Sequence, residues 1–154
     1  MTIRWLLAGL HLLALGLGLG AVWVRGRALS SRLDERGLRS VFLADMWWGI
    51  AAFLWIATGL WRLLAGLEKN TRYYFQNHFF LTKMGFLAVI LVLEVWPMIT
   101  LIRWRRQVMA GGFPDTRVAP VLARISFAQA VLVMLMVFLA SAMARGYGVS
   151  SQSQ

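Results

Sequence analysis

The sequence predicts an all-α integral membrane protein, built as a bundle of four transmembrane helices. Two features of the composition predict this class. Of the 154 residues, 60% are hydrophobic, whereas soluble domains usually hold about 45–50%. Only 14% of the residues are charged. Because one crossing of the hydrocarbon layer takes about 20 apolar residues, the chain has room for about four spans with short connections.

Each expected span is an apolar run that ends in charged or turn-forming residues. We expect spans at about residues 5–24, 41–67, 78–102 and 120–144. The first run is longer than the apolar region of a signal peptide and lacks a cleavage site after it, so we expect it to be retained. The segment Gly-Gly-Phe-Pro-Asp at 111–115 marks a turn before the last span. A single membrane domain should therefore cover residues 1–154, with a mobile tail at 146–154.

The basic residues predict how the chain is oriented in the membrane. A net charge of +10 would indicate nucleic-acid binding in a soluble protein, but these residues lie mostly at the ends of apolar runs, so we expect no nucleic-acid partner. Nine lie in the connections on one side, namely Arg25, Arg27, Arg32, Arg36, Arg39, Arg103, Arg105, Arg106 and Arg117. Four lie on the other side, namely Arg4, Lys69, Arg72 and Arg145. The positive-inside rule then places both termini on the periplasmic side of a bacterial inner membrane.

Ionisable residues within the spans are the candidates for a functional site, because they are costly in hydrocarbon unless they are paired or turned inward. On the cytoplasmic side, Asp45, Glu94 and Arg124 are expected at similar depths. Their opposite charges predict a structural ion-pair network that ties the spans together, with a catalytic role as the alternative. Pro97 follows Glu94 by three residues and is expected to kink the third span beside it.

A second group of polar residues, near the outer side, is short of acids. At about 1.5 Å per residue, His11 and Lys83 lie roughly 8–9 Å below the outer surface, with Arg62 at a similar level. They predict a site for a carboxylate or phosphate group, or else Lys83 and Arg62 reach lipid headgroups. His11 is the candidate metal ligand, with hydrogen-bonded packing as the alternative. Gly18 shares its helix face and would admit a flat porphyrin, although close helix packing is the usual role of such glycines.

Several short motifs occur together along most of the chain. They are Leu10-His11-Leu12, Val24-Arg25-Gly26-Arg27-Ala28-Leu29, Ala44-Asp45, Trp48-Gly49-Ile50, Thr58-Gly59-Leu60, Glu68-Lys69, Tyr73-Tyr74, Lys83-Met84 and Glu94-Val95-Trp96-Pro97-Met98. In these motifs the chain resembles the bacterial membrane family catalogued as domain of unknown function 2214. That family has no established activity, so the resemblance implies a membrane protein without implying a reaction.

A more distant resemblance is to the four-helix membrane protoporphyrinogen oxidases and to copper-resistance protein D. His11 and Arg27 have the spacing of the oxidase pattern, and Lys83 matches its third-span lysine. Leu81 and Glu94 stand where that pattern has histidines. The resemblance implies a haem b-binding or tetrapyrrole-linked redox protein, with His11 as an axial ligand and the outer cations at the carboxylates.

The alternative is a non-enzymatic protein that assists membrane assembly or handles copper. The chain has no cysteine, which removes disulfides, thiolate metal sites and covalent c-type haem attachment. The lipid bilayer is the expected environment, and a second copy of the chain or a membrane redox partner is the expected protein partner. Whether the protein is an enzyme stays open at this point.

Overall fold

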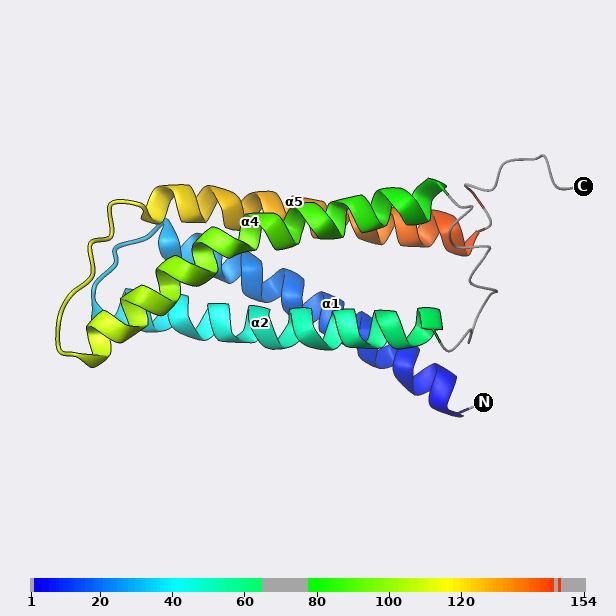
Figure 1. Cartoon of the computed structure of the whole chain (residues 1–154), viewed down its shortest axis with the longest axis horizontal. Helices are drawn as coiled ribbons and strands as arrows, with labels where there is room; N and C mark the ends of the chain where they lie inside the picture. Colours follow the sequence, from blue (N-terminus) through cyan, green and yellow to red (C-terminus); the bar gives the residue numbers. More distant parts are fainter. Residues whose placement is uncertain (1, 65–77, 146, 148–154) are drawn as a thin grey trace, which may run out of the picture.

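The computed structural model describes residues 2–64, 78–145 and 147, and the described residues form four long helices (Figure 1). They are α1 (Thr2–Leu29), α2 (Glu35–Leu64), α4 (His78–Met109) and α5 (Ala119–Ala144). All four are long and apolar enough to cross a membrane. The predicted all-α, four-span bundle is therefore confirmed. The expected tail at 146–154 lies outside the described residues, apart from Tyr147.

The helices extend beyond the expected spans at one end of the bundle, where residues 30–34 connect α1 to α2 and residues 110–118 connect α4 to α5. We name this the loop end, and the end where α1 begins and α5 ends the terminal end. At the loop end, α1 ends at Leu29, α2 begins at Glu35 and α4 ends at Met109. The side chain of Asp34 accepts a hydrogen bond from Gly37 N at 2.8 Å, which caps the first turn of α2.

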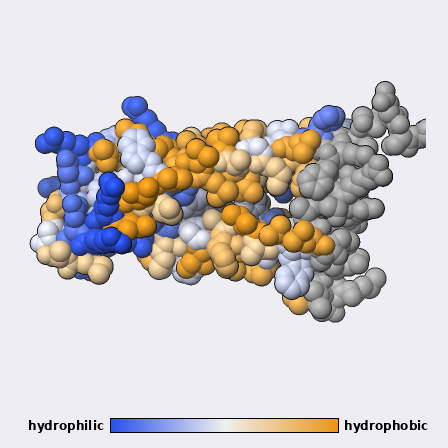
Figure 2. Space-filling view, viewed as in Figure 1, coloured by the Kyte–Doolittle hydropathy of each residue, from blue (hydrophilic) through white to orange (hydrophobic). Residues whose placement is uncertain are grey.

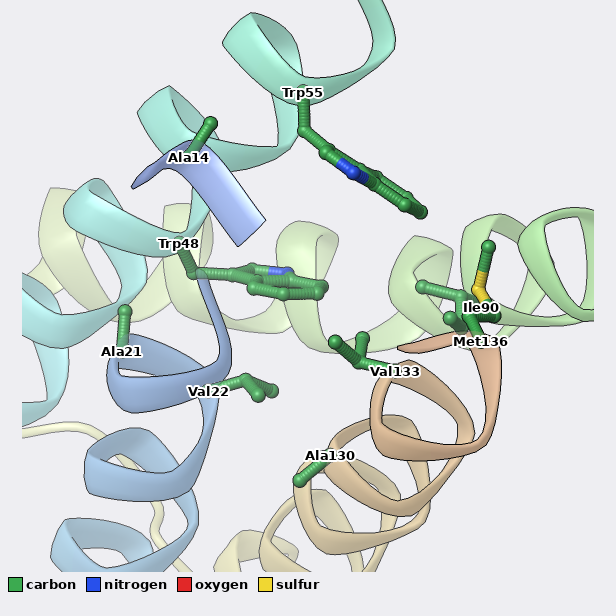
Figure 3. Close-up of a cluster of buried hydrophobic side chains, with 9 residues drawn as sticks. All are labelled: Ala14, Ala21, Val22, Trp48, Trp55, Ile90, Ala130, Val133 and Met136. Carbon is green, nitrogen blue, oxygen red and sulfur yellow. The ribbon is translucent and has the colours of Figure 1, made fainter. Parts of the chain in front are cut away.

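Apolar packing at the loop end explains these longer helices. Side chains from all four helices form one buried cluster there, consisting of Leu29, Leu38, Val41, Leu101, Trp104, Ala119, Leu122 and Ala123. A second cluster fills the middle of the bundle (Figure 3), consisting of Ala14, Ala21, Val22, Trp48, Trp55, Ile90, Ala130, Val133 and Met136. Burying the first cluster stabilises helical turns beyond the predicted apolar runs, so those runs alone underestimated the length of the helices.

The closely packed helix pairs are α1 with α2, α1 with α5, and α4 with α5. Glycines permit the first two of these approaches. A Cβ atom on Gly18 would lie 3.4 Å from the Cβ of Ala51, and one on Gly26 would lie 2.9 Å from the ring of Phe127. In this structure, Gly18 therefore allows α1 and α2 to pack closely, which is the usual role of such glycines in membrane helices. The pair of α2 and α4 is not among the close pairs in the described part of the chain.

The helix α4 changes direction along its length (Figure 1). Near its C-terminal end, α4 contacts α2: Arg105 Nη2 donates a hydrogen bond to the carbonyl oxygen of Phe42 at 2.8 Å. Pro97 lies inside α4 and is buried. A proline within a helix removes one backbone hydrogen bond and displaces the carbonyl four residues earlier, which supplies a physical cause for the bend.

The outer surface of the bundle has the character of a lipid-facing surface. Each helix exposes a large apolar side chain: Leu13, Phe53, Val92 and Phe138 are each 72–73% exposed. Hydrophobic residues cover the middle of the molecule, and hydrophilic residues gather at the loop end (Figure 2). Soluble proteins rarely expose so much apolar surface to water, so these faces indicate a bilayer environment.

Candidate functional site

Arg25 lies at the centre of the bundle, and its side chain is 0% exposed. Its guanidinium donates to Asp45 Oδ1 at 2.9 Å and to the two carboxylate oxygens of Glu94 at 2.7 and 2.8 Å. It also donates to Ser126 Oγ at 3.1 Å and to Gln129 Oε1 at 2.8 Å. One arginine of α1 is therefore bonded to α2, α4 and α5 together, and the paired contact with Glu94 is the strongest geometry available to it.

The charges around Arg25 balance locally. Asp45 holds Arg25 through one oxygen and Arg105 Nη2 through the other, at 2.9 and 2.8 Å. Two arginines therefore face two carboxylates, Asp45 and Glu94. An uncompensated charge at this depth would cost several kcal/mol, so the balance is what allows the group to lie inside a membrane bundle.

Neutral side chains complete the hydrogen bonding of this group. Gln129 is 0% exposed and donates from Nε2 to Glu94 Oε2 at 2.8 Å and to the carbonyl of Ile90 at 3.2 Å. Ser126 Oγ donates to the carbonyl of Leu122 at 2.9 Å. We name this set the polar layer; its members are Arg25, Asp45, Glu94, Arg105, Ser126 and Gln129. It separates the two apolar clusters. Its buried polar atoms are hydrogen-bonded except Arg105 Nε, which has no partner among the described residues, and such a network is intolerant of single losses.

The structure changes one member of the predicted inner network. Asp45 and Glu94 do meet, but Arg25 joins them in place of Arg124. Arg124 is exposed and makes no ion pair among the described residues. It lies two positions from the inward-facing Ser126, and two positions along a helix are about 200° of rotation. Its side chain therefore points away from the bundle axis.

Sequence reasoning missed Arg25 because we assigned it to a cytoplasmic connection after the first apolar run. Arg105 was assigned to a connection in the same way. A signal for Arg25 was present: Val22 and Leu29 flank it at three and four residues, which places all three on one helix face. Both flanking side chains are buried. An arginine on the apolar face of a helix is expected to be buried and paired with an acidic residue, and this pattern argues against placing it in a loop.

A second polar group lies nearer the terminal end. The ring of His11 is 8% exposed, and its Nδ1 lies 2.9 Å from Thr58 Oγ1. The same ring stacks on the indole of Trp55, with centroids 5.6 Å apart. Lys83 Nζ lies 5.9 Å from the centre of that indole. The structure therefore brings His11 and Lys83, two of the predicted outer-site residues, to one aromatic side chain.

A glycine creates the space for the histidine. A Cβ on Gly59 would lie 3.1 Å from His11 Cε1, so the imidazole occupies room that any larger residue would fill. The third predicted outer-site residue, Arg62, belongs to the last turn of α2, but its side chain lies outside the described part of the chain. We name the set His11, Trp55, Thr58 and Lys83 the Trp55 cluster.

A groove runs between α2 and α4, from the polar layer towards the Trp55 cluster. Its cavity volume is ≈ 50 Å³. Its walls are apolar apart from the Glu94 end, and they include Ala14, Gly18, Trp48, Ala51, Ala52, Trp55, Ile56, Leu87, Ile90, Leu91 and Val133. Trp55 is 9% exposed, and its Nε1–H finds no hydrogen-bond acceptor among the described residues. A buried donor without an acceptor costs about 1–3 kcal/mol, so this one calls for an explanation.

The groove does not fit a haem in the closed bundle. Pockets for molecules of that size measure about 300–1,000 Å³, and even a benzene ring fills a cavity of about 150 Å³. The groove's cavity volume of ≈ 50 Å³ admits about two water molecules or the end of a narrow chain. The imidazole of His11 is also packed against Trp55 and Gly59. A resident copper ion fits no better, because no three His, Asp or Glu side chains converge within the described residues.

The fold and this site define a class: a four-helix membrane bundle held by one buried arginine, with a lateral apolar groove beside it. The chain belongs to the family of predicted membrane proteins named DUF2214, whose model matches residues 3–148. The family resemblance inferred from the motifs is thereby confirmed, and it brings no activity with it. No curated protein and no solved structure matches the chain.

Proposed function

We propose that the protein binds a slender lipid-soluble molecule that enters the α2–α4 groove from the bilayer. The single observation that carries this proposal is the buried Nε1–H of Trp55, a residue of the groove lining; this donor has no acceptor among the described residues. A ligand with a carboxylate or carbonyl oxygen would satisfy that donor. The apolar walls suit a hydrocarbon chain, and α2 and α4 are not among the closely packed helix pairs of the described residues. This is a binding role without a reaction, in line with the non-enzymatic alternative.

Lys83 is the residue we propose for the charged end of such a ligand, with His11 beside it. Lys83 and His11 lie on different helices and meet at the same indole. An ammonium over an indole is partly desolvated, which strengthens its attraction to a carboxylate. Arg62 follows in the last turn of α2 and is proposed as a second cation for the same group.

Native mass spectrometry of the full chain, released from detergent with added palmitic acid, tests this role. We expect one palmitate adduct on the wild type. Trp55→Phe keeps an aromatic side chain and removes the donor, so the affinity for palmitate should fall about tenfold, the worth of one hydrogen bond to a charged group. Ala52→Leu should block the groove. The matched controls are Trp5→Phe, 74% exposed, and Ala57→Leu, which faces outward on the same helix as Ala52.

Two results would contradict the proposal. One is a wild type that takes no palmitate, and the other is an affinity that is equal in Trp55→Phe and Trp5→Phe. The absorption spectrum of the same preparation tests the narrower hypothesis that the protein binds haem b. This hypothesis requires α2 and α4 to separate around a porphyrin. A Soret band that disappears in His11→Ala would establish a tetrapyrrole as the occupant and overturn the slender ligand.

We also propose that the loop end faces the cytoplasm of a bacterium and that both termini are periplasmic. Arg25 and Arg105 belong to the polar layer and leave the loop count, but the loop end still carries seven of the counted basic residues against four. Fusions at the C-terminus test this orientation. We expect an active alkaline phosphatase and a dark green fluorescent protein, since each folds on one side only. A fluorescent fusion with an inactive phosphatase would reverse the assignment.

A further inference from the structure

A second and larger cavity opens at the loop end, on the opposite side of the polar layer from the groove. It measures ≈ 420 Å³ and lies between the end of α1, the connection that follows it and the start of α5. Its apolar floor is formed by Leu29, Leu33, Ala119, Ala123 and Phe127, and its polar rim by Ser30, Ser31, Thr116 and Arg124. We name it the loop-end pocket. An apolar floor under a polar rim suits an amphiphile rather than a free ion.

The charge around the loop-end pocket favours an anion. Arg124 is the ionisable residue of its lining, and it is exposed without an ion-pair partner among the described residues. The exposed arginines of this end are Arg27, Arg32, Arg36, Arg39, Arg103, Arg106, Arg117 and Arg124, whereas its exposed acids are Asp34, Glu35 and Asp115. This excess leaves a positive potential that attracts the headgroups of anionic lipids.

The two serines of the rim offer acceptors rather than donors. Ser30 Oγ donates its hydrogen to the carbonyl of Gly26 at 2.9 Å, and Ser31 Oγ donates to the carbonyl of Ala28 at 2.8 Å. Their oxygens can then accept hydrogen bonds from a ligand. A headgroup that carries hydroxyl groups beside its phosphate would match this rim, because Arg124 serves the phosphate and the serines serve the hydroxyls.

The pocket also lies at the ends of candidate membrane spans, where lipid headgroups are expected. Two candidate membrane spans, Trp5–Leu29 and Ala119–Ala144, have their ends at it. Trp23 packs edge-on against Phe127 of the floor, with ring centroids 5.2 Å apart, and is 50% exposed. Tryptophan side chains concentrate at the interface between hydrocarbon and water. An acyl chain could therefore leave the pocket along Phe127 into the bilayer.

We propose that the loop-end pocket binds an anionic phospholipid with a hydroxylated headgroup, of the phosphatidylglycerol type. Arg124 pairs with the phosphate, and the Ser30 and Ser31 oxygens accept from the glycerol hydroxyls. This site is independent of the α2–α4 groove, since the two share no lining residue. It also gives Arg124 a role outside the polar layer.

The test is native mass spectrometry of the full chain with phosphatidylglycerol, phosphatidylmethanol and phosphatidylcholine of identical acyl chains. We expect the wild type to retain phosphatidylglycerol best. Arg124→Gln should reduce that retention about fivefold, the usual worth of one arginine near a membrane surface. Arg117→Gln is the control, because Arg117 is exposed at the same end of the bundle, in the connection before α5, but does not line the pocket. Equal losses in the two variants would reduce the effect to general surface charge and overturn the site.

The headgroup and the source of the phosphate are tested separately. The double variant Ser30→Ala/Ser31→Ala should lose the preference for phosphatidylglycerol over phosphatidylmethanol and keep the preference for both over phosphatidylcholine. An unchanged preference would remove the serines from the site. Inorganic phosphate added in excess should not displace the lipid; if it does so in the wild type but not in Arg124→Gln, the pocket is a site for free phosphate and the lipid assignment is wrong.

Discussion

Replacing Arg25 with methionine is expected to destabilise the protein by about 3–5 kcal/mol, the cost of removing one partner from a buried ion pair. Methionine keeps an unbranched apolar stem without the guanidinium, and it leaves Asp45 and Glu94 without their shared cation. Gln129 and Ser126 would lose an interaction as well. The measurement is thermal unfolding in a mild detergent, followed by circular dichroism and by size-exclusion chromatography after heating.

Two further variants give this experiment its meaning. Arg27→Gln removes an exposed arginine two positions from Arg25, and its melting temperature should equal that of the wild type. The double variant Arg25→Met/Glu94→Gln removes one acid together with the cation and keeps the Asp45–Arg105 pair, so it should recover part of the loss, because no buried carboxylate then lacks a cation. A melting temperature of Arg25→Met equal to that of the wild type would mean that water reaches the polar layer and that its pairs contribute little.

The second large effect is expected from Gly26→Leu, where α1 meets α5. A Cβ at this position would lie 2.9 Å from Phe127 Cε1 and 3.1 Å from two further atoms of the ring. Overpacking of this kind costs about 1–3 kcal/mol, and occasionally more. The cost should reach the upper end here, because moving α1 away from α5 also stretches the bonds from Arg25 to Ser126 and Gln129.

Gly20→Leu is the control for this steric argument. Gly20 lies in the same helix, and nothing lies within 4 Å of a Cβ built there. The leucine raises helix propensity without a clash, so this variant should unfold at or slightly above the wild-type temperature. If Gly26→Leu and Gly20→Leu have the same melting temperature, the ring of Phe127 has room to turn away. The contact between Gly26 and Phe127 then does not set the distance between α1 and α5.

The polar layer and the α2–α4 groove together suggest how stability and binding are divided in this protein. The strong bonds of Arg25 hold all four helices at one level. The pair of α2 and α4 is not among the close helix pairs of the described residues. A bundle anchored at one level can open elsewhere without coming apart, which is what entry of a ligand from the bilayer requires. Variants of the groove should therefore change binding more than stability, and variants of the polar layer the reverse.

The class of the fold was determined by the sequence alone. Four apolar runs of sufficient length predict four transmembrane helices, because within a bilayer a single segment satisfies its own backbone hydrogen bonds only as a helix. The same logic marked Asp45 and Glu94 as paired residues and placed His11 and Lys83 at one depth. These inferences depend on distance along one helix, which is a local quantity that the sequence contains.

The partner of the two acids was decided only by the tertiary structure. Arg25 and Arg124 both stand near the loop end in the sequence, and the charge count is the same for either. Which of them turns inward depends on the rotation of α1 and α5 about their axes, and that rotation is set by packing of residues such as Gly26 and Phe127 from distant parts of the chain. Trp55 Nε1–H has no acceptor among the described residues, and this too is decided by the tertiary structure, because the placement of the other helices determines whether an acceptor comes within reach.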